Sequence, residues 1–217
     1  MMWNHPRCIH VHIPKTAGNS ISAALKSAWR STPVLRRMVL LASGGGRPPF
    51  VKPREIHKHA KARDILEVIG EDSWRRGFSF AFVRNPWDLM VSSYHWWLER
   101  ADRWEQFRDS AREIRALGSF AGFMNSAYGR EQINEQRGNL RDWICDRDQR
   151  IVVDFVGRFE RLEEDWTVIA EHLGITQPLP HRNRSTRGPY RQYYTSATRD
   201  IVARRFAWAI DRFEYCF

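Results

Sequence analysis

The segment Cys8 to Ser20, CIHVHIPKTAGNS, decides the fold. Its first part, Cys8 to Ile13, alternates small or aliphatic residues with histidines, a period-two pattern that predicts a short strand. Pro14 to Gly18 follows as a loop, and Asn19 to Trp29 has the apolar spacing of a helix. A strand, a tight loop and a helix in this order form the unit from which parallel α/β sheets are built.

A second unit of the same kind is expected downstream. Phe78 to Val83 is almost wholly apolar, as a central parallel strand buried on both faces should be. Directly after it, Asn85 can cap a helix and Pro86 can occupy the first turn, so a helix should run from there to about Leu98.

The remaining elements complete an alternating pattern. A third strand is predicted over Ile151 to Val156, and helices are predicted over Lys61 to Ile69, Glu163 to Leu173 and Thr195 to Phe213. Arg100 to Arg141 is charged and weakly periodic, which indicates a set of short helices. Alternating strands and helices predict an α/β fold with three layers, α/β/α, around a central parallel sheet.

The length of 217 residues suits one compact domain with insertions, spanning residues 1–217. Two segments are predicted to be loops. Ser43 to Pro53 contains three consecutive glycines and three prolines, and Gln177 to Tyr190 is basic and contains proline.

Charge and composition limit the class of protein. The chain carries 35 Lys and Arg against 25 Asp and Glu, a net charge of +10, which attracts anionic ligands. Nucleic acid, a membrane surface, an acidic polysaccharide and a multiply charged nucleotide are all compatible with this charge. Cys8, Cys145 and Cys216 form no CxxC pair, which favours a reducing compartment. Without an apolar leader or a run of roughly 18 apolar residues, we expect a cytoplasmic protein with no membrane span.

The loop Pro14 to Ser20 is chemically suited to bind phosphate or phosphosulfate. The N–H groups at a helix start are unpaired, and the helix dipole favours an anion there. Lys15 adds a point charge, and Gly18 permits a tight turn and the close approach of a ligand. Short polar donors are added by Thr16, Asn19 and Ser20. The lysine precedes the glycine, so the loop is not a Walker A motif, and the alternative is a plain turn with an exposed lysine.

The segment Arg84 to Tyr94, RNPWDLMVSSY, is a second candidate phosphate loop. Arg84 lies at the carboxyl end of the predicted strand, where ligands of open α/β sheets bind. Ser92 follows about two helical turns later, and an arginine fork with a hydroxyl suits a terminal phosphate. In the alternative, Arg84 pairs with a carboxylate and Ser92 only packs. Two such loops at adjacent strand ends suggest one ligand with phosphates at both ends.

These motifs resemble those of one enzyme family. HIPKTAGNS resembles the 5'-phosphosulfate loop of sulfotransferases that use 3'-phosphoadenosine-5'-phosphosulfate (PAPS), and RNPWDLMVSSY resembles their 3'-phosphate motif. IHKHAKARDI, DFVGRFERLEEDW and the C-terminal segments LPHRNRSTRGPYRQYY and DRFEYCF are similar in order and spacing to the carbohydrate-type family, which includes heparan sulfate 2-O-sulfotransferases and bacterial relatives. The resemblance covers nearly the whole chain. Asn19 and Leu89 depart from it, since Thr and Arg are commoner there.

The resemblance implies a P-loop-NTPase-like sulfotransferase fold and transfer of the sulfuryl group of PAPS to an acceptor hydroxyl, with PAP as product and no metal required. Lys15 would then neutralise the leaving group at the oxygen that bridges phosphate and sulfate. The 5' end of the donor would be held by Thr16, Ala17, Gly18, Asn19 and Ser20. The 3'-phosphate would be held by Arg84 and Ser92, with Arg184 and Arg187 closing over the nucleotide from the C-terminal basic loop.

An acceptor hydroxyl needs a general base. His57-Lys58-His59 resembles the His-x-His that supplies this base in the 2-O-sulfotransferases, and we favour His59, with His57 as the second candidate or as an acceptor contact. Two ordinary surface histidines are the alternative. His10, His12 and this pair could together suggest a zinc site. Packing, or an anion near His12, explains the two strand histidines instead, and we expect no metal ligands.

The acceptor side is less determined. We expect residues 99–150 approximately to form a helical insertion that shapes the acceptor pocket. Trp96, Trp97 and Trp104 are candidate stacking faces for a sugar, or core residues. We expect the acceptor to be a glycan, a glycoconjugate or a small molecule with a hydroxyl. A kinase-like phosphotransferase and a basic nucleic-acid-binding protein are the competing functions, but the first lacks a Walker A lysine and the second lacks a recognisable motif.

Overall fold

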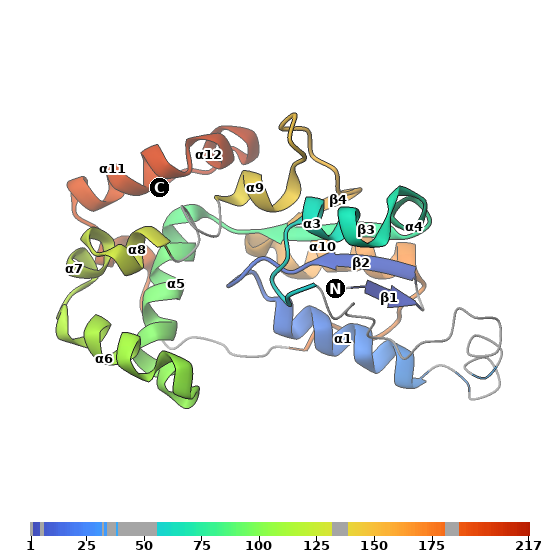
Figure 1. Ribbon diagram of the computed structural model, residues 1–217, viewed down its shortest axis with the longest axis horizontal. Coiled ribbons are helices and arrows are strands. Elements are labelled where there is room, and N and C mark those ends of the chain that lie inside the picture. Colours follow the sequence, from blue (N-terminus) through green and yellow to red (C-terminus); the bar gives the residue numbers. More distant parts are fainter. Residues whose placement is uncertain are drawn as a thin grey trace. The chain divides into compact units, whose positions relative to one another are not determined.

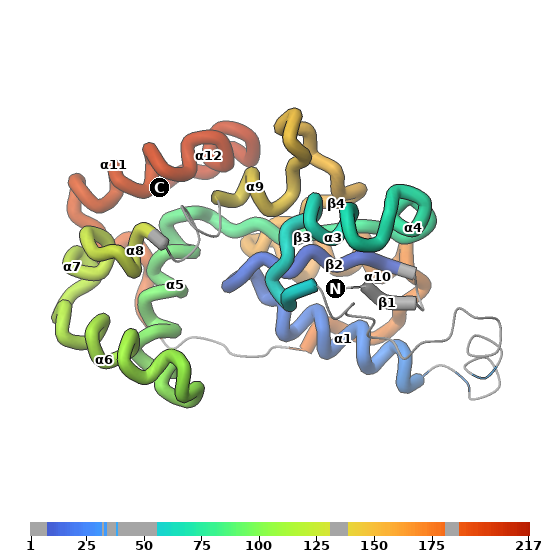
Figure 2. Tube along the Cα trace, viewed as in Figure 1, coloured from blue at the N-terminus to red at the C-terminus, as the bar shows by residue number. Residues whose placement is uncertain are grey.

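The computed structural model describes residues 2–4, 7–31, 33, 38, 56–131, 139–180 and 187–217. The chain divides into two compact units, and each is assembled from segments that are far apart in the sequence. The sheet unit comprises Met1–Val83 and Asp142–Asn183, and the helical unit comprises Arg84–Arg141 and Arg184–Phe217. The colour bar of Figure 2 lets the reader follow each segment along the chain.

The sheet has the strand order β1-β2-β3-β4. Strand β2 (Arg7–Val11) pairs in parallel with β3 (Phe78–Val83), and β3 pairs in parallel with β4 (Phe155–Arg158). Strand β1 (Met2–Asn4), which we did not predict, adds an antiparallel edge to β2. The predicted parallel sheet is therefore confirmed for three strands, and their carboxyl ends share one edge of the sheet.

Helices cover this sheet, as the alternating pattern predicted (Figure 1). Side chains of α1 (Gly18–Ser31) and α10 (Leu162–Leu173) form one hydrophobic cluster with side chains of β2 and β3. Ile9, Val11, Ala81 and Val83 alternate with these strand residues, so they point to the opposite face, and they are also buried. The sheet unit further contains α3 (Ala62–Ile69), α4 (Glu71–Arg75), which packs against β3, and the 3₁₀ turn η4 (Phe159–Arg161). The predicted α/β fold is confirmed.

The helical unit begins with α5 (Pro86–Glu99). Asn85 caps this helix as predicted, because its side-chain oxygen accepts hydrogen bonds from the N–H groups of Trp87 and Asp88, at 3.0 and 3.4 Å. The described residues of the segment from Arg100 to Arg141, which are 100–131 and 139–141, form short helices, also as predicted. The further elements of this unit are η2 (Ala101–Arg103), η3 (Glu105–Phe107), α6 (Arg108–Ala116), α7 (Phe120–Asn125), α8 (Ala127–Glu131), η5 (Tyr190–Tyr193), α11 (Ser196–Arg205) and α12 (Ala207–Phe213).

Helix α9 (Leu140–Ile144) lies where the chain passes from one unit to the other. No helix within the described ranges is both long and apolar enough to cross a lipid bilayer. A single domain with an insertion at about residues 99–150 stays a prediction, as does the cytoplasmic location.

Two predicted elements are wrong in their extent. Strand β4 begins at Phe155, four residues after the predicted start, because the preceding Asp154 carboxylate accepts hydrogen bonds from both the N–H and the hydroxyl of Ser79, each at 2.7 Å. The last helix is interrupted at Phe206, whose φ of −111° and ψ of 20° are not helical. Burial of the Phe206 ring accompanies this break. The predicted loop Ser43 to Pro53 lies outside the described residues.

Candidate functional site

The loop between β2 and α1 has an unusual backbone. Lys15 and Ala17 have φ values of 67° and 65°, in the left-handed region that side chains other than glycine rarely adopt. Each such residue costs on the order of 1–3 kcal/mol, and residues of this kind cluster at ligand-binding loops. Turns that alternate in handedness direct successive N–H groups into a concave anion site. The loop therefore combines such a turn with the N-terminus of α1.

Internal hydrogen bonds hold this loop in place. The buried Thr16 hydroxyl donates to the carbonyl oxygen of Ile13 at 2.9 Å, so this side chain faces the protein. The carbonyl oxygen of Ala17 accepts from the N–H groups of Ser20 and Ile21, at 2.8 and 3.2 Å, and thereby starts the hydrogen bonding of α1. Thr16 thus stabilises the turn through its hydroxyl, and its N–H group is the part suited to a ligand.

Gly18 is needed at its position for a reason that the sequence did not reveal. A Cβ atom added to Gly18 would lie 2.0 Å from Nε2 of His12, a distance at which the two atoms overlap. The His12 ring is buried directly behind the loop, and its Nδ1 has no hydrogen-bond partner among the described residues. The His12 ring thus approaches Gly18 closely, and the close approach of a ligand to this residue stays a prediction.

The buried histidines beside the loop are uncharged. Burial lowers the pKa of His10 and of His12 well below the ordinary value, and the neighbouring His59 and Lys58 lower both further. The rings of His10 and His12 stack at 5.3 Å between centroids, and His10 stacks on Phe80 at 5.0 Å. Within the described ranges, no group of three or more His, Cys, Asp or Glu side chains is placed so that it could hold a metal ion.

His59 lies beside the loop in a defined orientation. Its ring contacts the His12 ring at 4.6 Å between centroids, and its Nδ1 is 3.0 Å from the carbonyl oxygen of His12. A carbonyl oxygen can only accept, so Nδ1 of His59 carries the proton, and in the neutral ring Nε2 carries the lone pair. The adjacent Lys58 donates from Nζ to the side-chain oxygen of Asn19 at 3.1 Å, which ties this segment to the loop.

His57 has the opposite tautomer. Its Nδ1 accepts a hydrogen bond from the backbone N–H of His59 at 3.2 Å. The proton of neutral His57 therefore lies on Nε2, which can donate but cannot accept a proton. The geometry distinguishes two histidines that the sequence presented as near equals.

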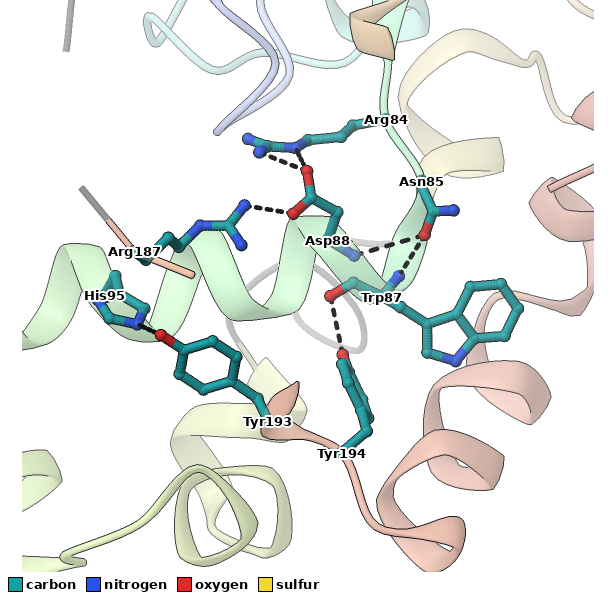
Figure 3. A network of polar contacts seen from close by, with 8 residues as sticks. All are labelled: Arg84, Asn85, Trp87, Asp88, His95, Arg187, Tyr193 and Tyr194. Carbon is teal, nitrogen blue, oxygen red and sulfur yellow. Dashed lines mark hydrogen bonds and ion pairs between the residues drawn. The ribbon is translucent and has the colours of Figure 1, made fainter. Parts of the chain in front are cut away.

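The second predicted motif forms a charged cluster in the helical unit (Figure 3). Nε and Nη2 of Arg84 contact Oδ2 of Asp88 at 2.7 and 2.6 Å, and Nη2 of Arg187 contacts Oδ1 of the same carboxylate. Ser92 lies on α5 one turn after Asp88 and therefore on the same face of the helix. The structure thus brings Arg84 and Arg187 together, whereas Arg184 lies outside the described residues.

Tyrosines of the segment that follows Arg187 also contact α5. The hydroxyl of Tyr193 is 2.9 Å from Nε2 of His95, and the hydroxyl of Tyr194 donates to the carbonyl oxygen of Trp87 at 2.8 Å (Figure 3). Sequence reasoning missed these residues and Asp88. The i,i+4 spacing of Arg84 and Asp88 was a usable signal. No sequence signal pointed to the contacts that Arg187, Tyr193 and Tyr194 make with α5, because these residues lie about a hundred positions away from it in the sequence.

The predicted site residues thus form two groups. In the sheet unit, the loop from Lys15 to Ser20 is joined by His57 and His59. In the helical unit, Arg84 and Arg187 meet at Asp88 near the start of α5, and Ser92 lies one turn further along this helix. Each of these two sets of residues contains side chains or backbone N–H groups suited to bind an anion. Their joint action on one ligand stays a prediction.

Comparison with known proteins identifies the family. The model of the sulfotransferase family matches residues 3–215. The chain belongs to the sulfotransferase family. It is also 30% identical over 120 residues to an uncharacterized protein of Archaeoglobus fulgidus. The aligned residues cover 54% of this chain and 85% of that protein. No solved structure matches the chain.

Membership of the sulfotransferase family confirms the predicted PAPS-dependent transferase activity and implies a PAPS donor. It also favours sulfuryl transfer over the kinase-like alternative, consistent with the missing Walker A lysine. The residues present fit this donor, because a strained turn at a helix N-terminus and a pair of arginines are both suited to bind oxyanions. The resemblance to the carbohydrate-type subfamily and the independence from metal stay predictions.

Proposed function

We propose that this sulfotransferase transfers the sulfuryl group of PAPS to a hydroxyl of a carbohydrate or glycoconjugate, with His59 as the general base. The observation that carries this proposal is the hydrogen bond from Nδ1 of His59 to the carbonyl oxygen of His12, at 3.0 Å. This bond leaves the lone pair on Nε2, where it can accept the proton of an acceptor hydroxyl. A small molecule with a hydroxyl is the second class of acceptor.

The donor is held at both ends in this proposal. The N–H groups from Thr16 to Ser20, together with Lys15, bind the 5'-phosphosulfate, and Arg84, Ser92, Arg184 and Arg187 bind the 3'-phosphate. Chain connectivity supports a shared ligand, because β2 and β3 are neighbouring parallel strands and Arg84 follows the last residue of β3. Ligands of open α/β sheets bind beyond the carboxyl ends of such strands.

The reaction is an in-line displacement. The acceptor oxygen forms a bond to sulfur while the bond from sulfur to the bridging phosphate oxygen breaks, and PAP leaves. The hydroxyl proton moves to Nε2 of His59, and Lys15 neutralises the negative charge that develops on the bridging oxygen. Each of these steps needs only groups of the chain and of its two substrates, and no metal enters the scheme.

In this proposal, aromatic residues of the helical unit bind the acceptor. Trp104 is 44% exposed and its ring lies at 31° to that of Trp96, so Trp104 offers a face to a sugar ring. Trp97 is only 4% exposed and belongs to the core. The net charge of +10 further favours an anionic acceptor such as an acidic glycan.

The test is transfer from radiolabelled PAPS to panels of glycans, lipids, phenols and small hydroxylated metabolites. We expect the label to appear in glycans. The His59→Ala variant should lose about 10²–10⁴-fold in kcat and should still bind PAP. The His57→Ala variant is the matched control and should keep most of the kcat. Full activity of His59→Ala would show that His59 is not the general base. Labelling of phenols alone would contradict a carbohydrate acceptor.

A further inference from the structure

Asp88 joins the two arginines that are proposed to read the 3'-phosphate. Each oxygen of its carboxylate contacts a different arginine: Oδ2 contacts Arg84, and Oδ1 contacts Arg187 (Figure 3). The side chains of Arg84 and Arg187 are each 8% exposed, and that of Asp88 is 17% exposed. The three charges therefore form one buried ionic cluster, with two positive groups sharing one negative group.

An ordinary helix-stabilising role does not account for this arrangement. Asp88 lies in the first turn of α5, where a carboxylate favours the helix dipole without any arginine. Glu71 and Arg75 have the same i,i+4 spacing as Arg84 and Asp88, but their side chains are 70% and 72% exposed. The contact with Arg187, 99 residues away, adds a second cation that neither the dipole nor the spacing requires.

Electrostatics gives the carboxylate a specific effect. Two guanidinium groups that approach each other out of water repel strongly, and a carboxylate between them offsets this repulsion. A phosphate group requires the same convergence of cations, because arginines bind it through parallel N–H donors. The carboxylate thus keeps the arginines in a phosphate-like arrangement before any ligand arrives.

The segment that carries Arg187 is held at further points. Tyr194 donates to the carbonyl oxygen of Trp87, next to Asp88 in the sequence, and Tyr193 contacts His95 two turns further along α5. Burial raises the pKa of Tyr194, and the nearby Asp88 raises it further, so the hydroxyl remains a donor. The position of Arg187 is therefore set from the backbone side by the tyrosines and at the guanidinium by Asp88.

We propose that Asp88 is a positioning residue for nucleotide specificity, which holds Arg84 and Arg187 converged as a clasp for the 3'-phosphate of the donor. This inference rests on the proposed function. Asp88 does not touch the reacting atoms. It raises the fraction of molecules in which both arginines are in place, and the apparent affinity for a 3'-phosphorylated nucleotide rises with that fraction.

The test compares two nucleotides that differ only in the 3'-phosphate, PAP and AMP. Their dissociation constants are measured by calorimetry for the wild type and for the Asp88→Asn variant, which keeps the shape of the side chain and removes its charge. We expect the variant to lose roughly tenfold or more of the preference for PAP, because the arginines no longer converge. The AMP dissociation constant should stay the same, and Asp88→Glu should restore part of the preference.

The matched control is Asp200→Asn, which removes another carboxylate paired with an arginine in the same unit, on the exposed surface. It should leave both dissociation constants unchanged. If Asp88→Asn does not fold, Arg187→Ala tests the same clasp, and it should likewise lower the preference for PAP without changing AMP binding.

Several outcomes would overturn the role of Asp88. Unchanged preference in Asp88→Asn, tighter PAP binding, or an equal loss for PAP and AMP would each do so, as would unchanged preference in Arg187→Ala. A wild type that binds neither nucleotide would instead overturn the proposed donor. The failure of the clasp and the failure of the proposed function are thereby distinguished.

Discussion

The two candidate anion sites are built in opposite ways. In the sheet unit, the loop before α1 offers backbone N–H groups in a strained turn, and the rings packed behind it are kept uncharged by burial. In the helical unit, the site consists of two guanidinium groups that share one carboxylate. One site is made by backbone conformation and the other by side-chain charge.

This difference determines how each site should fail. A backbone site survives the loss of a side chain as long as the turn is preserved, and it is damaged by changes that move the turn. A side-chain site depends on every charge in it, because removing one group leaves another buried charge unpaired. The two sites should therefore respond differently to substitution.

The largest effect should separate Lys15 from Arg84. Lys15→Ala should lower kcat about 10²–10³-fold, because it removes charge stabilisation from the leaving group, while the N–H groups still bind PAP. Arg84→Ala should mainly weaken PAP binding. Initial rates with PAPS and calorimetry with PAP measure the two effects, and Arg30→Ala at the exposed end of α1 is the control. Equal weakening of PAP binding by both variants would break the contrast.

The backbone site should be sensitive to a single methyl group. Gly18→Ala should destabilise the protein by about 1–3 kcal/mol, because the added Cβ overlaps the buried ring of His12. Gly77→Ala is the control, since its Cβ would lie at an ordinary contact distance of 3.4 Å from Ile9. Urea unfolding measures both. A double variant with His12→Ala should be more stable than the sum of the single effects predicts, and simple additivity would contradict the proposed clash.

Acid should destabilise the sheet unit through its buried histidines. The folded chain keeps His10 and His12 uncharged, whereas the unfolded chain protonates them below about pH 6.5. The unfolded state therefore binds more protons, and the free energy of unfolding should fall by up to about 1.4 kcal/mol per pH unit for each histidine as the pH drops below that value.

The variant His10→Leu should reduce this slope, because it removes one of the two buried histidines. Urea titrations between neutral pH and the acid limit of the folded state measure the slopes. Equal slopes in His10→Leu and the wild type would show that His10 does not contribute to the acid sensitivity.

The smallest effect concerns the anchoring of the arginine cluster. Tyr194→Phe should cost about 0.5–1.5 kcal/mol, because it removes the 2.8 Å hydrogen bond to the carbonyl oxygen of Trp87. Tyr190→Phe is the control, since the Tyr190 hydroxyl is 3.5 Å from its acceptor, longer than a good hydrogen bond. Thermal unfolding of the two variants gives the comparison, and equal stabilities would exclude an anchoring role for Tyr194.

Local sequence patterns predicted much of this protein. The strand Phe78–Val83, the Asn85 cap and the helix α10, which Gly174 caps, follow from hydrophobic runs and capping residues. The extent of β4 did not follow, because the side chain of Asp154 contacts a strand 75 residues away. The break at Phe206 was also missed. The apolar residues keep their helical spacing across this position, so the sequence pattern gives no sign of the non-helical backbone at the buried Phe206.

The sequence by itself determined the two strand–loop–helix units, the residue types of each anion site and the resemblance to sulfotransferases, which the family match confirms. These are short-range properties, set by periodicity and by motifs of about ten residues. Only the tertiary structure decided that His12 needs Gly18, that the His12 carbonyl orients His59, and that Asp88 joins Arg84 to Arg187. The contacts of His59 with His12 and of Arg187 with Asp88 join residues 47 and 99 positions apart, and spacing along the chain carries no record of them.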